Sequence, residues 1–266
     1  ITDPDIVPYI PDGIGNSTDR QRIPAVLIIP GGAFRRLVYN FEGEDVAKWL
    51  NSMGIAAFVL ECRLPSDEHD NAEDVPLIDA MRAMRVIRGR AQEFGIDEAK
   101  IGVMGFSAGG FMAALLSTAY ESDVYADYKY KDEYDKLSAR PDFAVCSYPV
   151  ISIDDCIEAG KRYMSEEQVL ERISDSKAKI LHKYNPDKLV RPDMPPVFIC
   201  ETDDDRTTLS ENSVGFYMAA RKAGVSAELH IFRTGGHGYG CGDDFAQTGE
   251  WKVLFTKWIK SIGIIS

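Results

Sequence analysis

The sequence is short of basic residues and of long apolar runs, and each shortage excludes a class of protein. Lysine and arginine total 30 against 42 aspartates and glutamates, a formal net charge of −12. Such an acidic chain repels nucleic-acid phosphates and anionic membrane surfaces, so we expect neither as a partner. No stretch approaches the roughly 20 consecutive apolar residues that cross a bilayer. We therefore expect a soluble protein.

The first residues of the sequence do not predict a signal peptide, because a basic stretch followed by an apolar one is missing there. The first residue is Ile1 rather than methionine. An N-terminal truncation, a cytoplasmic location and secretion after processing all stay open, and the oligomeric state does too.

Closely spaced cysteines are also missing. The five cysteines, at positions 62, 146, 156, 200 and 241, are an odd number without a Cys-x-x-Cys spacing. This pattern indicates neither a disulfide framework nor a zinc site. We predict that most are small buried hydrophobic residues, and we expect no metal.

What the sequence does contain is an alternation of short β-rich runs with longer segments of helical period. This alternation is typical of a mostly parallel sheet with helices on both faces, and it predicts an α/β fold, a three-layer α/β/α sandwich. A hydrophobic content of 45% is enough for one large core, so we expect a single domain over 1–266. The predicted strands are 25–30, 56–61, 100–104, 143–147, 197–201 and 228–232, with 6–10 as a candidate edge strand.

The predicted helices are 44–52, 72–93, 108–119, 209–223 and 248–261. Thr208 followed by Glu211 predicts a capping box at the start of one helix, and Ser165 with Gln168 predicts another, which opens a helix to about Leu181. That last helix lies within 151–192, a stretch longer than a plain α/β unit needs. We interpret 151–192 as a cap or lid insertion.

A Gly-x-Ser-x-Gly motif, Gly105 to Gly109, directly follows a predicted buried strand and opens an apolar helix. A sharp strand-to-helix turn crowds the residues two before and two after the serine, so glycines are required there. The context predicts a nucleophile elbow that lifts Ser107 clear of the sheet. The alternative is a plain turn.

Acyl transfer at a serine also requires backbone N–H groups that stabilise the developing oxyanion. The small-residue stretch from Pro30 to Phe34 follows another predicted strand and suits this need. In this kind of fold one donor is the residue after the nucleophile, here Ala108, and another comes from this loop, here Gly32 or Ala33. A tight turn without a catalytic role is the alternative.

The general base and its carboxylate come from later loops. Of four histidines, His237 stands in a glycine-rich loop just past the last predicted strand, whereas His230 lies inside that strand. The acidic run from Asp203 to Asp205 follows the preceding strand. The order Ser, Asp, His, each after a successive strand, matches the α/β-hydrolase arrangement.

These residues resemble the α/β-hydrolase esterases of the acetyl xylan esterase and hormone-sensitive-lipase-like groups. The resemblance covers most of the chain and involves these motifs: Pro30-Gly31-Gly32-Ala33-Phe34, Glu42-Gly43, Val46-Ala47, Trp49-Leu50, Arg63-Leu64, the elbow at Ser107, Tyr148-Pro149-Val150 and Gly236-His237-Gly238.

The resemblance also bears on the catalytic acid. Such esterases carry it in an Asp-x-Val-Val-Pro stretch before an Asn-Ser helix start, and alignment on Asn212-Ser213 places it at Asp205. Because Thr207, Thr208 and Leu209 replace Val, Val and Pro, Asp203 and Asp204 stay as rivals. Arg63 is interpreted as structural, paired with Asp79.

The resemblance implies a serine esterase that uses Ser107, Asp205 and His237 and no cofactor. The Pro-Gly-Gly variant and the charged insertion favour short acyl groups, such as acetyl on xylan-type polysaccharides or oligosaccharides. Candidate substrate-binding residues are Phe34, Arg35, Arg36, Tyr148 and Tyr239. The alternatives are a feruloyl or general carboxylesterase, a peptidase or amidase, and a non-catalytic binding protein.

Overall fold

The computed structural model describes most of the chain, and the structural statements below refer to that part. The described residues are 3–13, 22–65, 69–126, 128, 131–162, 164–165, 167–169, 179–242 and 247–266.

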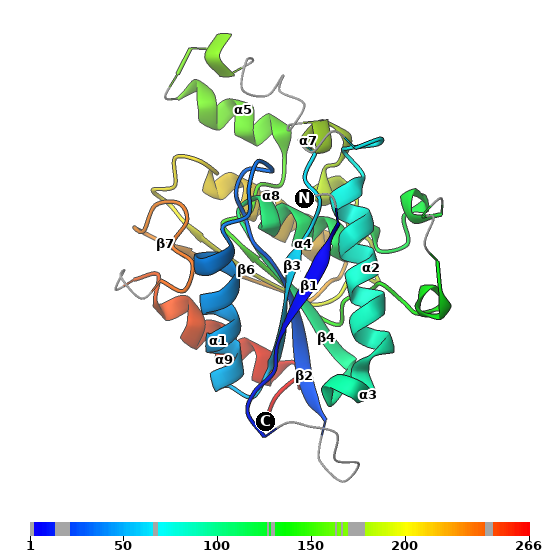
Figure 1. The fold of residues 1–266 in the computed structure, drawn as a ribbon. Coiled ribbons are helices and arrows are strands. Elements are labelled where there is room, and N and C mark those ends of the chain that lie inside the picture. Colours follow the sequence, from blue (N-terminus) through cyan, green and yellow to red (C-terminus); the bar gives the residue numbers. More distant parts are fainter. Residues whose placement is uncertain are drawn as a thin grey trace.

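A twisted sheet of seven strands forms the centre of the described structure, in the order β1-β3-β2-β4-β5-β6-β7 (Figure 1). All neighbouring strands pair in parallel except β1, which runs antiparallel to β3 at the edge. This confirms the predicted mostly parallel sheet and its edge strand. The strands are β1 Asp5–Tyr9, β2 Ile23–Ile29, β3 Ala56–Glu61, β4 Ile96–Phe106, β5 Ala144–Ser147, β6 Val197–Thr202 and β7 Ala227–Phe232.

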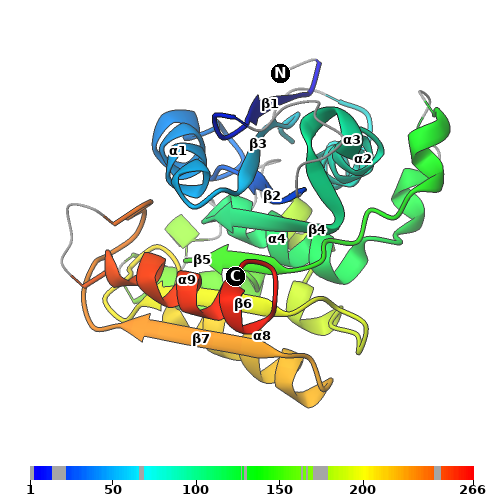
Figure 2. The ribbon, with the colours of Figure 1, turned by 90° about the horizontal axis from the view of Figure 1, so that it is seen from below.

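Helices cover both faces of the sheet and give the predicted three layers (Figure 2). The larger core lies between one face and helices that include α2, α4 and α8, and a second core lies between the other face and α1 and α9. Alternate residues of a strand serve the two cores, as Leu27 and Ile28 of β2 do. The helices are α1 Asp45–Ser52, α2 Val75–Gly89, α3 Ala91–Phe94, α4 Ala108–Ala119, α5 Ile153–Lys161, α7 Lys179–Lys183, α8 Ser210–Lys222 and α9 Glu250–Ser261.

Short helical turns connect these elements: η1 Asn40–Glu44, a π-helical turn that runs into α1, and the 3-10 turns η2 Asp123–Tyr125, η3 Glu133–Lys136 and η5 Pro186–Lys188.

Two predicted helix features are wrong. The helix predicted over 72–93 is two helices, because α2 ends at Gly89 and α3 begins at Ala91. The capping box predicted at Thr208 does not form: α8 begins after Leu209 without a side-chain cap. The hydroxyl of Thr208 instead donates to Asp205 Oδ2 at 2.9 Å, so a contact in the candidate active site competes successfully with the cap.

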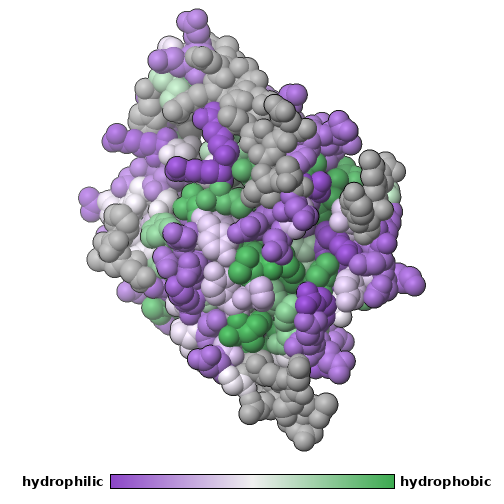
Figure 3. Space-filling model, viewed as in Figure 1, coloured by the Kyte–Doolittle hydropathy of each residue, from purple (hydrophilic) through white to green (hydrophobic). Residues whose placement is uncertain are grey.

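The predicted insertion contains α5, which lies beyond the edge at which the parallel strands end (Figure 1). The capping box of Ser165 and Gln168 is present, with the Ser165 N–H donating to the Gln168 side chain and the Gln168 N–H donating to Ser165 Oγ. Residues 170–178 of the predicted helix lie outside the described part. The face drawn in Figure 3 is largely hydrophilic, with apolar side chains gathered near the edge strand β1. None of the described helices combines the length and the apolar character that a bilayer span requires.

Candidate active site

The residues predicted for catalysis all follow strands that end at one edge of the sheet. The Gly31–Phe34 stretch follows β2, Ser107 follows β4, Asp205 follows β6 and His237 follows β7. Because parallel strands end on the same side, their following loops meet there. Segments up to 130 residues apart in the sequence therefore come into hydrogen-bond contact.

Ser107 occupies the turn between β4 and α4 with a φ of 53°. A positive φ is unfavourable for a residue with a Cβ atom and marks the strained elbow that presents the side chain. The predicted reason for the flanking glycines is confirmed: a Cβ on Gly105 would overlap the carbonyl oxygen of Gly109, and one on Gly109 would overlap that of Ile29. Only glycine fits at either position.

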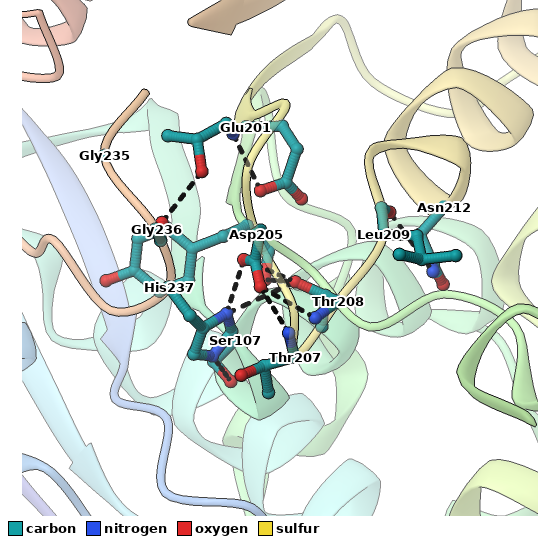
Figure 4. Close-up of polar contacts among 12 residues, drawn as sticks. Ser107, Glu201, Asp205, Thr207, Thr208, Leu209, Asn212, Gly235, Gly236 and His237 are labelled. Atoms are coloured by element: carbon teal, nitrogen blue, oxygen red, sulfur yellow. Dashed lines mark hydrogen bonds and ion pairs between the residues drawn. The ribbon is translucent and has the colours of Figure 1, made fainter. Parts of the chain in front are cut away.

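A continuous line of hydrogen bonds joins the serine to a buried carboxylate (Figure 4). Ser107 Oγ lies 2.8 Å from Nε2 of His237, and Nδ1 of His237 lies 2.6 Å from Oδ2 of Asp205. Because an ionised carboxylate only accepts, Nδ1 carries the proton and Nε2 is free to accept one from the serine. The ring is thus held in the tautomer that a general base requires.

The carboxylate of Asp205 is fully buried and well supplied with donors. Its Oδ1 accepts from the N–H groups of Thr207 at 2.7 Å and Thr208 at 2.9 Å. Burial alone would raise the pKa of Asp205, but His237 and these hydrogen bonds outweigh it and hold the pKa below its usual value. Asp205 is therefore ionised beside the imidazole at neutral pH.

The two rival aspartates are placed differently. Asp203 and Asp204 are both exposed, whereas Asp205 is 2% exposed. The Oδ1 atom of Asp204 accepts from the N–H groups of Gly235 at 3.0 Å and Gly236 at 2.8 Å. Asp204 therefore supports the loop that carries His237, and only Asp205 of the three contacts the ring.

Of the predicted oxyanion donors, Ala108 directly follows Ser107, and Gly32 and Ala33 follow Gly31, which lies against the serine. A Cβ on Gly31 would be 3.0 Å from Cβ of Ser107. Ala33 has a φ of 56°, so the chain turns sharply after Gly32, and no described residue accepts a hydrogen bond from the N–H of Gly32 or Ala33. Ala108 is the first residue of α4, where N–H groups lack partners within the helix.

The predicted substrate-binding residues do not form one surface. Tyr148 and Tyr239 are 0% exposed, so in this structure neither presents surface to a ligand, and that prediction is wrong for both. Their rings pack edge to face with centroids 4.5 Å apart, inside the second core. Phe34 is also buried, against Phe111, whereas Arg35 is exposed. Arg36 is exposed as well.

A small cavity of about 10 Å³ lies beside the Gly31–Phe34 stretch. Its lining includes Phe34, Leu64, Ala108 and Met112. A volume of this size holds about one water-sized group.

The sequence analysis assigned no role to two buried carboxyl groups at the site. Glu42 is 4% exposed and Glu201 is 0% exposed. Burial raises the pKa of Glu42, and burial followed by the nearby Asp205 raises that of Glu201 well above its usual value. A glutamate at the end of an apolar strand run was the available signal for Glu201. In the described part of the chain, no three His, Cys, Asp or Glu side chains are grouped as metal ligands would be.

Three features together define the class of protein: the parallel sheet with one antiparallel edge strand, the elbow after β4, and the three side chains after β4, β6 and β7. This is the fold of the α/β-hydrolase esterases. Comparison with known proteins gives the same class and identifies a family within it. Residues 14–219 match the BD-FAE family, so the chain belongs to that family.

Two relatives carry names that refer to xylan. The chain is 31% identical over 240 residues to an acetylxylan esterase of Xylanibacter ruminicola. The aligned region covers 90% of this chain and 45% of that protein. The chain is 31% identical over 227 residues to endo-1,4-beta-xylanase B of Butyrivibrio fibrisolvens, covering 85% of this chain and 34% of that one. The chain thus spans less than half the length of each of these two relatives.

A solved structure matches over nearly the whole chain. The acetyl ester-xyloside bifunctional hydrolase of Caldicellulosiruptor lactoaceticus has a TM-score of 0.81 and 37% identity, with 99% of this chain and 89% of that chain covered. The similarity confirms the α/β-hydrolase fold.

Proposed function

We propose that this chain is a serine esterase that removes short acyl groups, acetyl foremost, from xylan-type polysaccharides or their oligosaccharides. The observation that carries the proposal is the hydrogen-bonded line from Ser107 through His237 to Asp205. The names of the relatives support the substrate class, since one is an acetylxylan esterase and another an acetyl ester-xyloside hydrolase.

The proposed reaction uses the side chains of Ser107 and His237, backbone N–H groups and water. His237 takes the proton from Ser107, and the alkoxide attacks the ester carbonyl to give a tetrahedral intermediate. The N–H groups of Gly32, Ala33 and Ala108 stabilise its oxyanion, at roughly 3 to 4 kcal/mol for each donor. His237 then protonates the leaving alcohol, and a water activated by the same ring releases the acid from the acyl-enzyme.

Two features support a short acyl group. The cavity beside the Gly31–Phe34 stretch, which borders the proposed oxyanion donor Ala108, is only about 10 Å³ and leaves no room for a long acyl chain. The insertion over 151–192, which we propose acts as a cap on the single hydrolase domain, carries exposed charges at Glu158, Lys161 and Arg162. A charged cap suits a hydrated sugar ester better than a lipid.

The test compares the wild type, Ser107→Ala and Ser52→Ala, an exposed serine whose hydroxyl donates only to the carbonyl of Trp49. The substrates are p-nitrophenyl acetate, butyrate and octanoate, with acetate release measured separately from acetylated xylan. We expect rates that fall with chain length, disappear in Ser107→Ala and persist in Ser52→Ala.

Ester hydrolysis that survives in Ser107→Ala would overturn the assignment of the nucleophile. Hydrolysis of the small esters or of methyl ferulate without acetate release from xylan would instead favour a general or feruloyl carboxylesterase.

A further inference from the structure

Glu42 is a buried acid that touches the loop carrying the proposed oxyanion donors. It lies in η1 and is 4% exposed, and each of its carboxylate oxygens has one donor. Oε2 accepts from the N–H of Gly31 at 2.7 Å, and Oε1 accepts from the hydroxyl of Tyr148 at 2.9 Å. A buried carboxyl group with both oxygens directed at specific donors holds its partners in place.

Tyr148 continues this connection to the loop that carries the histidine. Its hydroxyl also accepts from the N–H of Gly240 at 3.0 Å, and its ring meets the ring of His237 edge to face at 5.1 Å between centroids. The residue is fully buried, with a φ of 37°. Its carbonyl oxygen lies 3.4 Å from the hydroxyl of Thr208.

The two loops joined in this way follow strands that are not neighbours in the sheet, so their backbones are linked only through the ladders of the strands between them. One follows β2 and the other follows β7, and the sheet order places β4, β5 and β6 between these two strands. Tyr148 follows β5, midway between them. The side chains of Glu42 and Tyr148 therefore connect the two loops directly, in addition to the path through the sheet.

We propose that Glu42 and Tyr148 are a positioning pair that fixes the oxyanion loop relative to the histidine loop by the path Gly31 N–H, Glu42, Tyr148 hydroxyl, Gly240 N–H. The proposal rests on the serine-esterase function proposed above. Neither residue contacts the substrate. The pair orients the peptide that precedes the N–H groups of Gly32 and Ala33. An oxyanion hole is effective only when its N–H donors already point at the position of the oxyanion before the reaction begins.

The structure explains why a tyrosine and a glutamate are needed. The tyrosine hydroxyl is at once a donor to Glu42 and an acceptor from Gly240, which phenylalanine cannot replace. A carboxylate accepts at both oxygens, whereas glutamine at position 42 would present an NH₂ group to one of the two donors and keep only one of the bonds.

Tyr148→Phe is the decisive variant, because it deletes one hydroxyl and leaves the buried ring. We expect kcat on p-nitrophenyl acetate to fall about 10- to 100-fold with KM nearly unchanged. A misplaced oxyanion loop stabilises the transition state less well, whereas binding of the substrate in the ground state is unaffected. Binding of an alkylboronic acid, which forms a tetrahedral adduct on the serine, weakens by a similar factor. Glu42→Gln shows the same changes to a smaller extent.

Tyr120→Phe is the matched control. Tyr120 is buried, its hydroxyl donates to Oδ2 of Asp193 at 2.7 Å, and it lies at the end of α4 opposite to Ser107, so this variant loses the same kind of bond away from the serine. We expect lower thermal stability with kcat retained. If Tyr148→Phe is too unstable to purify, Glu42→Gln provides the test.

Wild-type kcat and boronic acid affinity in folded Tyr148→Phe or Glu42→Gln would overturn the positioning pair, and so would an equal loss of kcat in Tyr120→Phe. Ser107→Ala separates this result from failure of the proposed function: an active Ser107→Ala rejects the serine mechanism itself, whereas an inactive Ser107→Ala with fully active Tyr148→Phe rejects only the pair.

Discussion

A Cβ atom on Gly105 would fall inside the van der Waals radius of the carbonyl oxygen of Gly109. The turn around Ser107 is therefore too tight for any side chain at position 105. We predict that Gly105→Ala destabilises the fold by at least about 1 to 3 kcal/mol and removes most ester hydrolysis, because backbone must move to make room. Denaturation in urea and the p-nitrophenyl acetate assay measure the two effects.

Gly215→Ala provides the control, since nothing lies within 4 Å of a Cβ at this position in α8. Alanine is the better helix former, so this variant gains about 0.5 to 1 kcal/mol and keeps its activity. Equal behaviour of the two variants would contradict the steric account.

Among the three adjacent aspartates, only Asp205 should matter strongly for kcat. Asp205→Asn cannot hold the histidine in the required tautomer, so we expect kcat to fall by about 10³- to 10⁴-fold with little change in KM. Asp204→Asn retains Oδ1 as an acceptor for Gly235 and Gly236 and should leave kcat close to wild type. Steady-state kinetics of the two variants decide the point, and a larger loss in Asp204→Asn would refute it.

Glu201 makes the fold less stable as pH rises. Its pKa is raised well above 4.5 by burial and by Asp205, so the folded state binds this proton more tightly than the unfolded state does. The free energy of unfolding therefore declines as pH rises above about 4.5, by up to about 1.4 kcal/mol for each pH unit, until the folded pKa is passed. Glu201→Gln cannot lose this proton and should gain stability relative to wild type between pH 5 and pH 8.

Glu211→Gln is the comparison for that measurement. Its backbone hydrogen bond and Arg162 hold the pKa of Glu211 below 4.5, so it is ionised in both states above pH 5. The difference between this variant and wild type should not change from pH 5 to pH 8. Urea denaturation at both pH values gives the result, and a flat difference for Glu201→Gln would reject the assignment.

The ion pair of Arg63 and Asp79 should contribute to stability without contributing to catalysis. Asp79 is 3% exposed and accepts from the N–H of Arg63 at 2.8 Å and from its Nη2 at 2.5 Å. Asp79→Ala leaves these donors unpaired, so we expect a loss of about 3 to 5 kcal/mol in urea denaturation with unchanged activity per folded molecule.

Glu98→Ala is the matched change at an exposed pair, in which Arg22 is 47% and Glu98 62% exposed. It should cost no more than about 1 kcal/mol. Equal losses in Asp79→Ala and Glu98→Ala would show that burial does not strengthen the Arg63 pair.

Several features could be predicted because they depend on local sequence. The alternation of apolar runs predicted the parallel sheet, and the Arg63–Asp79 pair predicted from the sequence is present at 2.5 Å. The break between α2 and α3 was missed, and so was the true start of β4 at Ile96. Both lie where turn geometry and strand pairing override the periodicity of the sequence.

The sequence by itself determined the glycine pattern around Ser107 and the order in which serine, aspartate and histidine follow their strands. These depend on steric rules and chain order, which a linear sequence contains. Only the tertiary structure decided which of three adjacent carboxylates meets His237 and that Glu42 and Tyr148 are buried beneath the loops. Such choices depend on distances between segments 32 to 130 residues apart, which packing of the whole sheet sets.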